Sequence, residues 1–354
     1  MKNFWKNKKV FITGHTGFKG SWLTLVLHSL GAKIAGYALN PISKPNFFDD
    51  LNLRKYLTKE HRQDINNFKT LNKAIKNFRP SIVFHLAAQS SVLVSYQKPR
   101  ETVNANVIGT TNLLESVKKI KSIKSVIIVT TDKVYLNLEK KKKFKENEKL
   151  GGFDVYSSSK AACDIVTESY IKSFFSNTNC GVSIVRSGNC IGGGDWTKDR
   201  IVKDCAQSFA KNKKLIIRSP NATRPWQHVL DPLIGYLKLV RKNYNNNKFN
   251  GPWNFGPDTK KNLKVKQLVL IGKKIFNSKS KIILKKKQYY ESENLALDSS
   301  KAKKFLNWTT KFDDIKSLDM TFKWYKYFYK NKNKTGLVKL SFDQINIFKS
   351  KHKI

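Results

Sequence analysis

The sequence predicts an α/β protein with a doubly wound parallel sheet, followed by a smaller, mixed α/β domain. Three observations favour this class. Short apolar runs alternate with longer amphipathic stretches through the first half of the chain. The run Val-Ile-Ile-Val at 126–129 suits a strand that is buried on both faces, and a glycine-rich segment follows the first apolar run. Strands linked by helices in this way form parallel sheets that are covered by helices.

The elements expected in the first 130 residues alternate between strand and helix. Residues 9–13 (KVFIT) predict the first strand, because they form a compact apolar run. The amphipathic stretch 20–30 predicts the first helix, and the apolar run 33–38 predicts the second strand. By the same criteria we expect a helix at 71–78, a strand at 82–86, a helix at 103–118 and a strand at 125–129.

Three glycines lie between the first predicted strand and the first predicted helix, in the pattern GxxGxxG. Gly14 would allow a sharp turn after the strand, Gly17 a close approach of backbone N–H groups to a diphosphate, and Gly20 tight packing of the helix on the sheet. The positive end of the helix would then face the diphosphate. The alternative is an ordinary strand-to-helix turn with no ligand.

Tyr156 and Lys160 form a YxxxK pattern. Residues four apart on a helix share one face, so the lysine ammonium can lie beside the tyrosine hydroxyl. A nearby cation stabilises a phenolate, which makes the tyrosine a usable base at neutral pH. Thr131 and Asp132 follow another predicted strand and would lie near this pair. The alternative is a surface Tyr-Lys pair without catalytic function.

The charge is strongly positive, since 68 Lys and Arg against 25 Asp and Glu give +43. Such a charge is typical of proteins that bind nucleic acid. However, most of the excess is lysine spread over almost every segment, and its densest runs carry no nucleic-acid motif. We therefore expect no specific nucleic-acid partner, although the field should attract anionic ligands.

The sequence predicts a soluble, cytoplasmic protein without a metal site. The only early apolar stretch, 10–12, is too short for a signal peptide, and no later run approaches the length of a membrane span. The cysteines show neither CxxC spacing nor Cys/His clustering, which argues against a zinc site or a disulfide framework. They are Cys163, Cys180, Cys190 and Cys205.

The glycine pattern and the YxxxK pair together resemble the extended branch of the short-chain dehydrogenase/reductase superfamily, which has a Rossmann-type fold and acts on nucleotide sugars. Asp64-Ile65, the segment HLAAQ at 85–89 and the asparagines Asn104 and Asn106 fall where that branch has its further motifs. The resemblance implies NAD as cofactor. The cofactor-binding residues it implies are Gly14, Thr16, Gly17, Phe18, Lys19, Gly20, Asp64, Ile65, Leu86, Ala87, Ala88, Gln89, Asn106, Tyr156 and Lys160.

The choice between NAD and NADP follows from the resemblance alone. The second predicted strand ends near Asn40, and no acidic residue stands there to select the ribose 2′-hydroxyl of NAD. Gln63 also stands where the superfamily usually has glycine. NADP is therefore not excluded by the sequence.

Six segments, between about residues 8 and 310, resemble the CDP-glucose 4,6-dehydratase family. They are TGHTGFKGSWL, HLAAQSSVLVSYQKP, TTDKVY, GGFDVYSSSKAACD, RSGNCIGGGDW and RPWQHVLDPLIGYL. Asp132-Lys133 and the loop 192–196 are the most specific of these features, because dehydratases for other nucleotide sugars differ there. By contrast, the lysine-loaded stretch 136–152 departs from the aromatic pattern of the family.

The resemblance implies a hydro-lyase that makes a 4-keto-6-deoxy sugar, the precursor of deoxysugars in bacterial surface polysaccharides. Tyr156 would take the proton of the sugar 4-hydroxyl, with Thr131 bonded to the same oxygen and Lys160 stabilising the phenolate. Asp132 would protonate the departing 6-hydroxyl. Lys133 would remove the C5 proton, or alternatively act as a cation that orients a substrate oxygen.

The second half of the chain is expected to bind the nucleotide sugar. Arginines suit the diphosphate because they donate two hydrogen bonds to its oxygens. The candidates are Ser91, Asn189, Asp195, Trp196, Arg200, Arg218, Arg224 and His228. For His228 a structural role is an equal alternative.

The expected domains are a dinucleotide-binding domain at 1–185, to which 222–255 returns, and a mainly nucleotide-sugar-binding domain at 186–330. The segment 331–354 is a basic tail without a pattern that predicts a role. By analogy with the superfamily we expect a homodimer or a dimer of dimers. Two other functions remain open: another NAD-dependent 4,6-dehydratase or 4-epimerase of the branch, and a non-catalytic basic module that binds RNA or protein.

Overall fold

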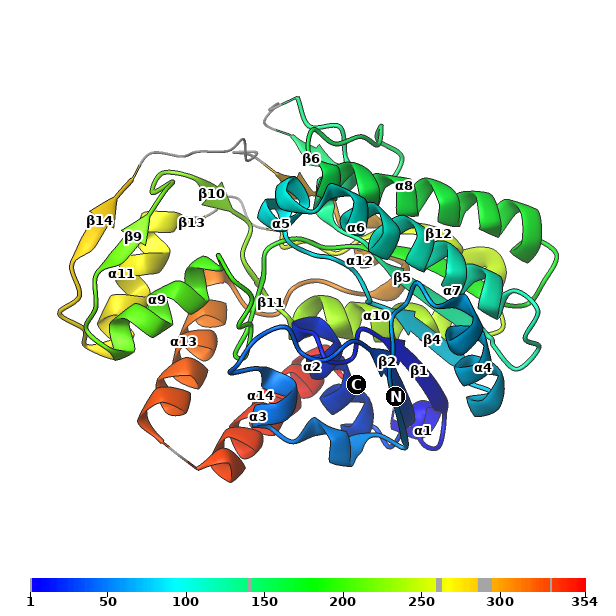
Figure 1. Cartoon of the computed structure of the whole chain (residues 1–354), viewed down its shortest axis with the longest axis horizontal. Coiled ribbons are helices and arrows are strands. Elements are labelled where there is room, and N and C mark those ends of the chain that lie inside the picture. Colours follow the sequence, from blue (N-terminus) through cyan, green and yellow to red (C-terminus); the bar gives the residue numbers. More distant parts are fainter. Residues whose placement is uncertain (1, 139–141, 259–262, 286–294, 332) are drawn as a thin grey trace.

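The computed structural model describes residues 2–138, 142–258, 263–285, 295–331 and 333–354. Its centre is a parallel sheet of seven strands in the order β12-β7-β5-β4-β1-β2-β3 (Figure 1). The strands are β1 (Lys9–Thr13), β2 (Lys33–Ala38), β3 (Lys59–Arg62), β4 (Ile82–His85), β5 (Ser125–Val129), β7 (Gly181–Arg186) and β12 (Gly251–Asn254). This is the doubly wound sheet that the sequence predicts.

The apolar runs place the central strands correctly. The predicted strands 9–13, 33–38 and 125–129 coincide with β1, β2 and β5, and β4 ends one residue before the predicted 86. In the register of β1, Val10 lies opposite Ile34 on one side and Ile82 on the other. The edge strand β3 was not predicted, because its sequence KEHR has no apolar residue.

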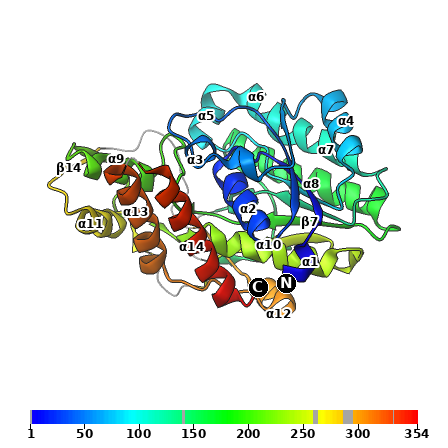
Figure 2. The same cartoon turned by 90° about the horizontal axis from the view of Figure 1, so that it is seen from below.

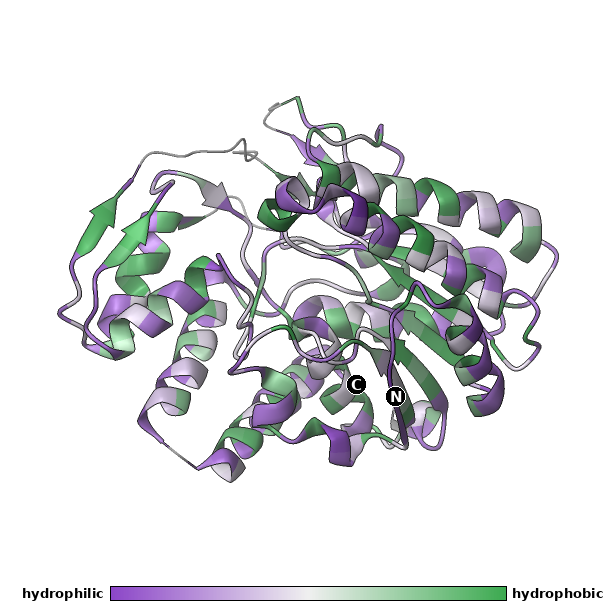
Figure 3. Ribbon diagram, viewed as in Figure 1, coloured by the Kyte–Doolittle hydropathy of each residue, from purple (hydrophilic) through white to green (hydrophobic). Residues whose placement is uncertain are grey.

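Two layers of helices cover the sheet. One face is covered by α2 (Phe18–Ser29) and α10 (Leu230–Asn243), and the other by α4 (Phe68–Phe78), α7 (Gly109–Val117) and α8 (Val155–Tyr170). Figure 3 shows the apolar strands between the mixed surfaces of the helices. The predicted helix 20–30 begins two residues earlier, at Phe18. The predicted helix 103–118 contains a π-helical turn at Asn104–Ile108, between α6 (Pro99–Val103) and α7.

A second unit follows the sheet at its carboxyl edge (Figure 1). It contains the parallel pair β9 (Leu215–Ile217) and β14 (Ile282–Leu284), together with α9 (Ile201–Ala210), α11 (Val265–Phe276) and α13 (Asp314–Lys330). The chain enters it through β8 (Cys190–Ile191), which pairs in parallel with β11 (Gln227–His228). The predicted catalytic residues Thr131, Asp132 and Lys133 follow the end of β5, which pairs with β7 in the sheet.

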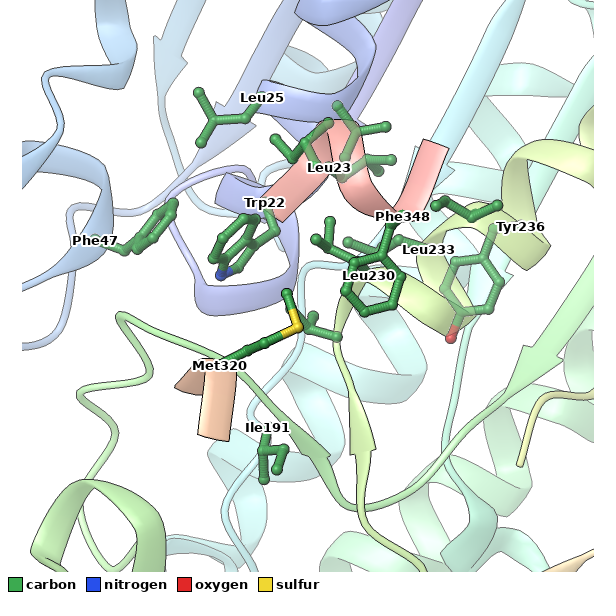
Figure 4. Close-up of a cluster of buried hydrophobic side chains, with 14 of the residues drawn as sticks. Trp22, Leu23, Leu25, Phe47, Ile191, Leu230, Leu233, Tyr236, Met320 and Phe348 are labelled. Atoms are coloured by element: carbon green, nitrogen blue, oxygen red, sulfur yellow. The ribbon is translucent and has the colours of Figure 1, made fainter. Parts of the chain in front are cut away.

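The segment 331–354, for which the sequence predicts no role, contains the helix α14 (Lys334–His352). It packs against α13, α10 and α2 (Figure 2). Phe348 stacks on His228 with ring centroids 4.8 Å apart, and His352 Nε2 lies 2.8 Å from Asp231 Oδ1 of α10. Figure 4 shows Phe348 in one apolar cluster with Trp22 of α2 and Leu233 of α10.

Two further observations concern the environment of the chain. Within the described ranges, no helix is both long enough and apolar enough to cross a membrane. All four cysteines are free.

The lysine-rich loop 139–149 is described only in part, because residues 139–141 lie outside the described residues. Lys143, which begins the short strand β6 (Lys143–Phe144), forms an ion pair with Asp258 at 2.7 Å.

Candidate active site

Helix α8 carries Tyr156 and Lys160 on one buried face. Its N-cap is Asp154, whose carboxylate accepts a hydrogen bond from Ser157 N and fixes the first turn. Both side chains are less than one-tenth exposed. Lys160 Nζ donates to the carbonyl of Val129, the last residue of β5, at 3.1 Å. The pair therefore lies at the carboxyl end of the central sheet, where parallel α/β sheets bind their ligands.

Tyr156 is surrounded by groups that act on its pKa in opposite directions. Burial is the largest of these effects and leaves the pKa of the phenol above its ordinary value, although a hydrogen bond with Thr131 lowers it. The charges of Arg200 and Lys19 also lower this pKa, and Asp132 raises it. For Lys160, burial lowers the pKa of the ammonium.

Residues 131–133 form the turn that leaves β5. Thr131 Oγ1 accepts a hydrogen bond from Lys133 N, which starts the 3₁₀ turn Asp132–Val134, and it donates to Asp132 Oδ1 at 2.9 Å. Asp132 is 3% exposed, and Lys133 is half-buried. Burial raises the pKa of Asp132, and this is opposed by Lys133, the Thr131 hydrogen bond, Lys19 and Arg224. A carboxyl group with a raised pKa is the kind of group that can donate a proton.

The loop after β7 closes over Asp132. Gly188 lies so near that a Cβ at this position would overlap Asp132 Oδ2. The next residue, Asn189, has a left-handed backbone (φ 44°). Gln227 Nε2 donates to the carbonyl of Gly188 at 3.1 Å and ties the loop to β11. The carboxylate of Asp132 is therefore bonded by Thr131 in its own turn and covered by Gly188 of the loop after β7.

The glycine segment has the shape that a dinucleotide requires. Gly14 has φ +74°, and a Cβ there would lie 2.6 Å from Ala87 N, so the turn rests directly on the end of β4. Gly17 is the N-cap of α2, which has neither a side-chain cap nor an acidic residue in its first turn. The first N–H groups of α2 are thus left to an anion, as at other helix N-termini that bind phosphate. Thr16 Oγ1 donates to Leu39 O, which fixes the turn against the end of β2.

Asn106 and Gln89, both predicted to bind the cofactor, form hydrogen bonds with the protein near the end of β4. Asn106 is fully buried; its Oδ1 accepts from Gln89 N at 2.9 Å, and its Nδ2 donates to Ser159 Oγ of α8 at 2.8 Å. Gln89 Nε2 in turn donates to Thr102. Asn106 and Gln89 thereby connect the segment 86–89 with the tyrosine helix.

Asp64 and Ile65 follow the edge strand β3, which ends at Arg62. Asp64 is exposed, and its Oδ1 accepts from Asn66 N at 2.9 Å. Ile65 is buried against Gly109, where a Cβ would lie 2.7 Å from Ile65 Cγ2. An exposed carboxylate beside a buried aliphatic residue is compatible with a flat ring that is bound at the surface.

The structure divides the predicted substrate-binding residues into two groups. Arg200 and Arg224 reach the site electrostatically, because Arg200 lowers the pKa of Tyr156 and Arg224 that of Asp132. Asp195 belongs to this side through its 3.7 Å ion pair with Arg200. Ser91 caps helix α5 (Val92–Gln97), in the loop that follows 86–89. Asn189 follows the glycine that covers Asp132.

Three predicted substrate-binding residues point elsewhere. Trp196 is 8% exposed and packs against Tyr325 and Phe328 of α13. His228 is fully buried between Trp22 and Phe348, and burial lowers its pKa to about 3, so it is a neutral core residue. Arg218 pairs with Asp199 at 3.1 Å on the surface of the second unit.

Sequence analysis missed the partners of Lys19. Its Nζ does not turn back to the glycine segment but donates to Ser187 Oγ, just after β7, at 2.8 Å. Ser187 Oγ also shares a hydrogen bond with the hydroxyl of Tyr236 in α10, at 2.7 Å. The segment RSGNC resembles a motif of the family, but nothing in its spacing indicates a contact with residue 19.

Known proteins are similar to this chain in sequence. The model of the GDP-mannose 4,6 dehydratase family matches residues 11–317. The chain is 42% identical, over 92% of its length and 92% of the relative's, to the CDP-glucose 4,6-dehydratase of Salmonella typhimurium. It is 27% identical over 69% of its length to the dTDP-D-glucose 4,6-dehydratase of Dictyostelium discoideum, of which it covers 58%.

Solved structures share the fold at lower identity. The dTDP-glucose 4,6-dehydratase of Bacillus anthracis, in complex with NAD, matches with a TM-score of 0.77 and 23% identity over 93% of this chain and 99% of the other. The UDP-glucuronic acid 4-epimerase of Bacillus cereus, in complex with UDP-glucuronic acid and NAD, matches with a TM-score of 0.78 and 22% identity over 91% and 100%. These similarities establish a Rossmann-type α/β architecture.

Proposed function

The chain belongs to the GDP-mannose 4,6 dehydratase family, and from this premise we propose that it is an NAD-dependent hydro-lyase that converts CDP-D-glucose to CDP-4-keto-6-deoxy-D-glucose and water. The similarity to a CDP-glucose 4,6-dehydratase over almost the whole chain supports the substrate. The observation that carries the reaction is the turn Thr131-Asp132-Lys133, which lies within electrostatic reach of Tyr156. Oxidation at C4 needs the base Tyr156, and elimination across C5 and C6 needs the acid and base in this turn, so the reaction requires both in one site.

The cofactor would bind along the carboxyl edge of the sheet. The uncapped N-terminus of α2 and the glycine turn would hold its diphosphate, the segment 86–89 would lie against its middle, and Asp64 with Ile65 would hold its adenine. Bound there, NAD supplies a hydride acceptor for C4 and the same hydride for C6. NAD rather than NADP remains a proposal, since the sequence at Asn40 contains no selective acid.

In the oxidation step, the Tyr156 phenolate takes the proton of the sugar 4-hydroxyl on its Oη while the hydride leaves C4. Thr131 bonds to the phenol and can bond to the same sugar oxygen. The ketone that forms at C4 makes the C5 proton acidic. Net charge is conserved, because the lost hydroxyl proton stays on Tyr156.

In the elimination step, Lys133 takes the C5 proton while Asp132 delivers a proton to the 6-hydroxyl, which leaves as water. The raised pKa of Asp132 favours the protonated acid that this step requires. When the hydride is returned to C6, Lys133 gives its proton back to C5. Lys133 must be neutral when it accepts the C5 proton. Before the next turnover Tyr156 must lose the proton it took from the 4-hydroxyl, and Asp132 must regain the proton it gave to the leaving water.

The second unit would bind the nucleotide. Arg200 and Arg224 border the site from that unit and can donate paired hydrogen bonds to the diphosphate oxygens. We accordingly assign 1–185, with α10 and β12, to the cofactor and most of 186–330 to the nucleotide sugar. Titration of CDP-glucose binding to two variants would test this assignment: Arg224→Gln should weaken binding, and Arg218→Gln, whose side chain is already paired with Asp199, should weaken it less.

We further propose that the enzyme is a homodimer, alone or within a dimer of dimers, and that it acts in the cytoplasm. Four large apolar side chains are exposed on neighbouring helices over one face of the sheet: Val103, Ile108, Ile165 and Phe174. Exposed apolar residues gathered in this way are typical of interfaces. Four free cysteines suit a reducing compartment.

The experiment that tests the proposal incubates the purified protein with NAD, or with NADP, and separately with CDP-glucose, dTDP-glucose, UDP-glucose or GDP-mannose. Loss of one water from CDP-glucose alone is the expected result, read by mass. Turnover of another nucleotide sugar would retain the reaction and overturn the substrate. A change of configuration at C4 without a change of mass would identify an epimerase, and binding to polyanions with no turnover of any sugar would favour a non-catalytic module.

A further inference from the structure

Arg186 and Asp164 form a buried ion pair between the central sheet and the helix that carries Tyr156. The Nε of Arg186, the last residue of β7, donates to Oδ2 of Asp164 in α8 at 2.5 Å. Both residues are fully buried. A buried ion pair is often no more stabilising than apolar residues of the same size, because both charges lose their hydration. Stability alone therefore does not explain a pair at this position.

The other end of the guanidinium is also held in place. Its Nη1 donates to the hydroxyl of Tyr135 at 2.8 Å and to the carbonyl of Glu146 at 3.0 Å. The Tyr135 hydroxyl in turn donates to Oδ1 of Asn254 in β12 at 2.8 Å. Because the guanidinium is planar and rigid, these bonds together with that to Asp164 fix its orientation. Arg186 thus presents Nε to α8 from a fixed place at the end of the sheet.

Asp164 lies on the same face of α8 as Tyr156 and Lys160, since residues four apart follow one another along one face of a helix. Lys160 Nζ is bonded to the carbonyl of Val129 at the end of β5, and Asp164 is bonded to Arg186 at the end of β7. These two strands are neighbours in the sheet. This face of α8 is therefore attached to two adjacent strand ends at points one helical turn apart, and Tyr156 lies one turn further towards the N-terminus.

The adjacent face of α8 is attached elsewhere. Ser159 Oγ accepts a hydrogen bond from Asn106 Nδ2 at 2.8 Å, and Cys163 Sγ donates to the carbonyl of Asn106 at 3.0 Å. Both bonds come from one residue, about which the helix could still rotate. The bond between Arg186 and Asp164 attaches the second face and so prevents this rotation.

We propose that Arg186 and Asp164 are positioning residues for C4 oxidation, which fix the rotation of α8 and thereby place Tyr156 and Lys160 at the sugar 4-hydroxyl. They act through the helix and take no part in the proton transfer itself. The catalytic consequence rests on the proposed function. The attachment of α8 does not, because it is present in the protein without substrate or cofactor.

The test replaces the ion pair by apolar residues of similar size in the double variant Arg186→Met/Asp164→Leu. Such an exchange is often neutral or stabilising, so the thermal unfolding midpoint should stay close to that of the parent protein. The bond that orients α8 is nevertheless lost. With NAD and CDP-glucose we expect C4 oxidation, followed as NADH absorbance in the first turnover, to slow by about tenfold to a hundredfold. The KM for CDP-glucose should change much less. A parent-like oxidation rate in this variant would overturn the proposal.

Two matched variants separate position from stability in the opposite direction. Asp164→Asn keeps an oxygen that can accept from Arg186 Nε but leaves the guanidinium without its counter-charge. It should be less stable than the double variant and yet oxidise C4 faster. Tyr135→Phe removes a bond of the same guanidinium that does not lead to α8, so it should lower the unfolding midpoint and slow oxidation far less than the double variant. Oxidation rates that simply follow the unfolding midpoints would contradict a positioning role.

Amide hydrogen exchange in the cofactor-free protein, read by mass spectrometry, tests the attachment without any reaction. In the double variant the peptides of α8 should exchange about five times faster, because they have lost a buried hydrogen bond, whereas those of α4 should not change. Unchanged exchange in α8 would overturn the proposal whatever the enzyme turns over. Faster exchange in α8, with no turnover of any nucleotide sugar by the parent protein, would overturn the proposed function and its catalytic consequence but confirm the attachment. If the double variant does not fold, Arg186→Lys, which keeps the charge but lacks the rigid fork, takes its place with the same expected and contradicting results.

Discussion

Gly188 is packed directly against the carboxylate of Asp132, in the space that any side chain at position 188 would need. The contact joins the turn after β5 to the loop after β7. Asp132 is also held by Thr131 from its own turn. The orientation of the predicted acid is thus determined by a residue that has no side chain.

The variant Gly188→Ala should displace Asp132 and impair water elimination more than C4 oxidation. A misplaced acid typically costs a factor of about 10² to 10⁴ in rate. Rapid-quench analysis by mass would detect this, since the 4-keto sugar that still carries its 6-hydroxyl should accumulate. Unchanged turnover in a folded variant would contradict the assigned position of Asp132, and circular dichroism provides the folding control.

Replacement of Lys133 distinguishes the base from an orienting cation. In D₂O, a base at Lys133 should place deuterium at C5 of the product, because it returns a solvent-exchanged proton. Lys133→Gln should therefore still oxidise C4 but lose exchange at C5, which is measured by mass and ¹H NMR. Retained exchange at C5 would assign the base role to another residue.

Tyr156→Phe should lower the rate by about 10² to 10⁴, because it removes the base and leaves the ring in place. The thermal unfolding midpoint should change little, since the hydroxyl faces the site and not the apolar core. Tyr135→Phe is the matched control. It removes a buried hydroxyl that is bonded to Asn254 and Arg186, so it should reduce stability more than turnover.

Acid should unfold the protein through two buried histidines. Burial lowers the pKa of His85 and of His228 to about 3. The unfolded chain binds protons at these residues below its ordinary pKa near 6.5, whereas the folded chain does not until about pH 3. The free energy of unfolding should therefore fall as the pH falls from 6.5 towards 3, by at most about 1.4 kcal/mol per pH unit and histidine.

Urea unfolding between pH 7 and pH 4 measures this slope. In His228→Phe the slope should be smaller, because one of the two proton-binding sites of the unfolded chain is gone. His61→Phe, at a partly exposed histidine of β3, is the control and should change the slope less. Equal slopes in all three proteins would contradict the buried, neutral state of His228.

If the protein forms the proposed dimer, Ile165→Glu should convert it to a monomer, because the variant places a charge among the exposed apolar residues of α6 to α8. Light scattering after gel filtration gives the mass directly. Ile347→Glu changes an equally apolar, exposed residue of α14 and should leave the dimer intact. If Ile347→Glu dissociated the dimer and Ile165→Glu did not, the interface would lie on α14.

The local pattern of the sequence predicts the central strands because each of them is a continuous apolar run, as in 125–129. It predicts Tyr156 and Lys160 because their spacing alone puts them on one face of a helix. It does not predict the contact of Lys19 with Ser187, which depends on how α2 and β7 are placed by the whole sheet. Nor does the local pattern predict that Trp196 packs against α13, because its aromatic neighbours there lie more than 120 residues later in the chain.

Helix α14 has a consequence for the order in which the protein can be assembled. The seven sheet strands end at Asn254, yet the apolar cluster between α2 and α10 is completed only by Phe348 and the Asp231–His352 pair. A ribosome that has released the sheet must still deliver about 100 further residues before this side is sealed. Until then the sides of α2 and α10 that α14 covers face water, and an emerging chain would be most open to chaperones and proteases there.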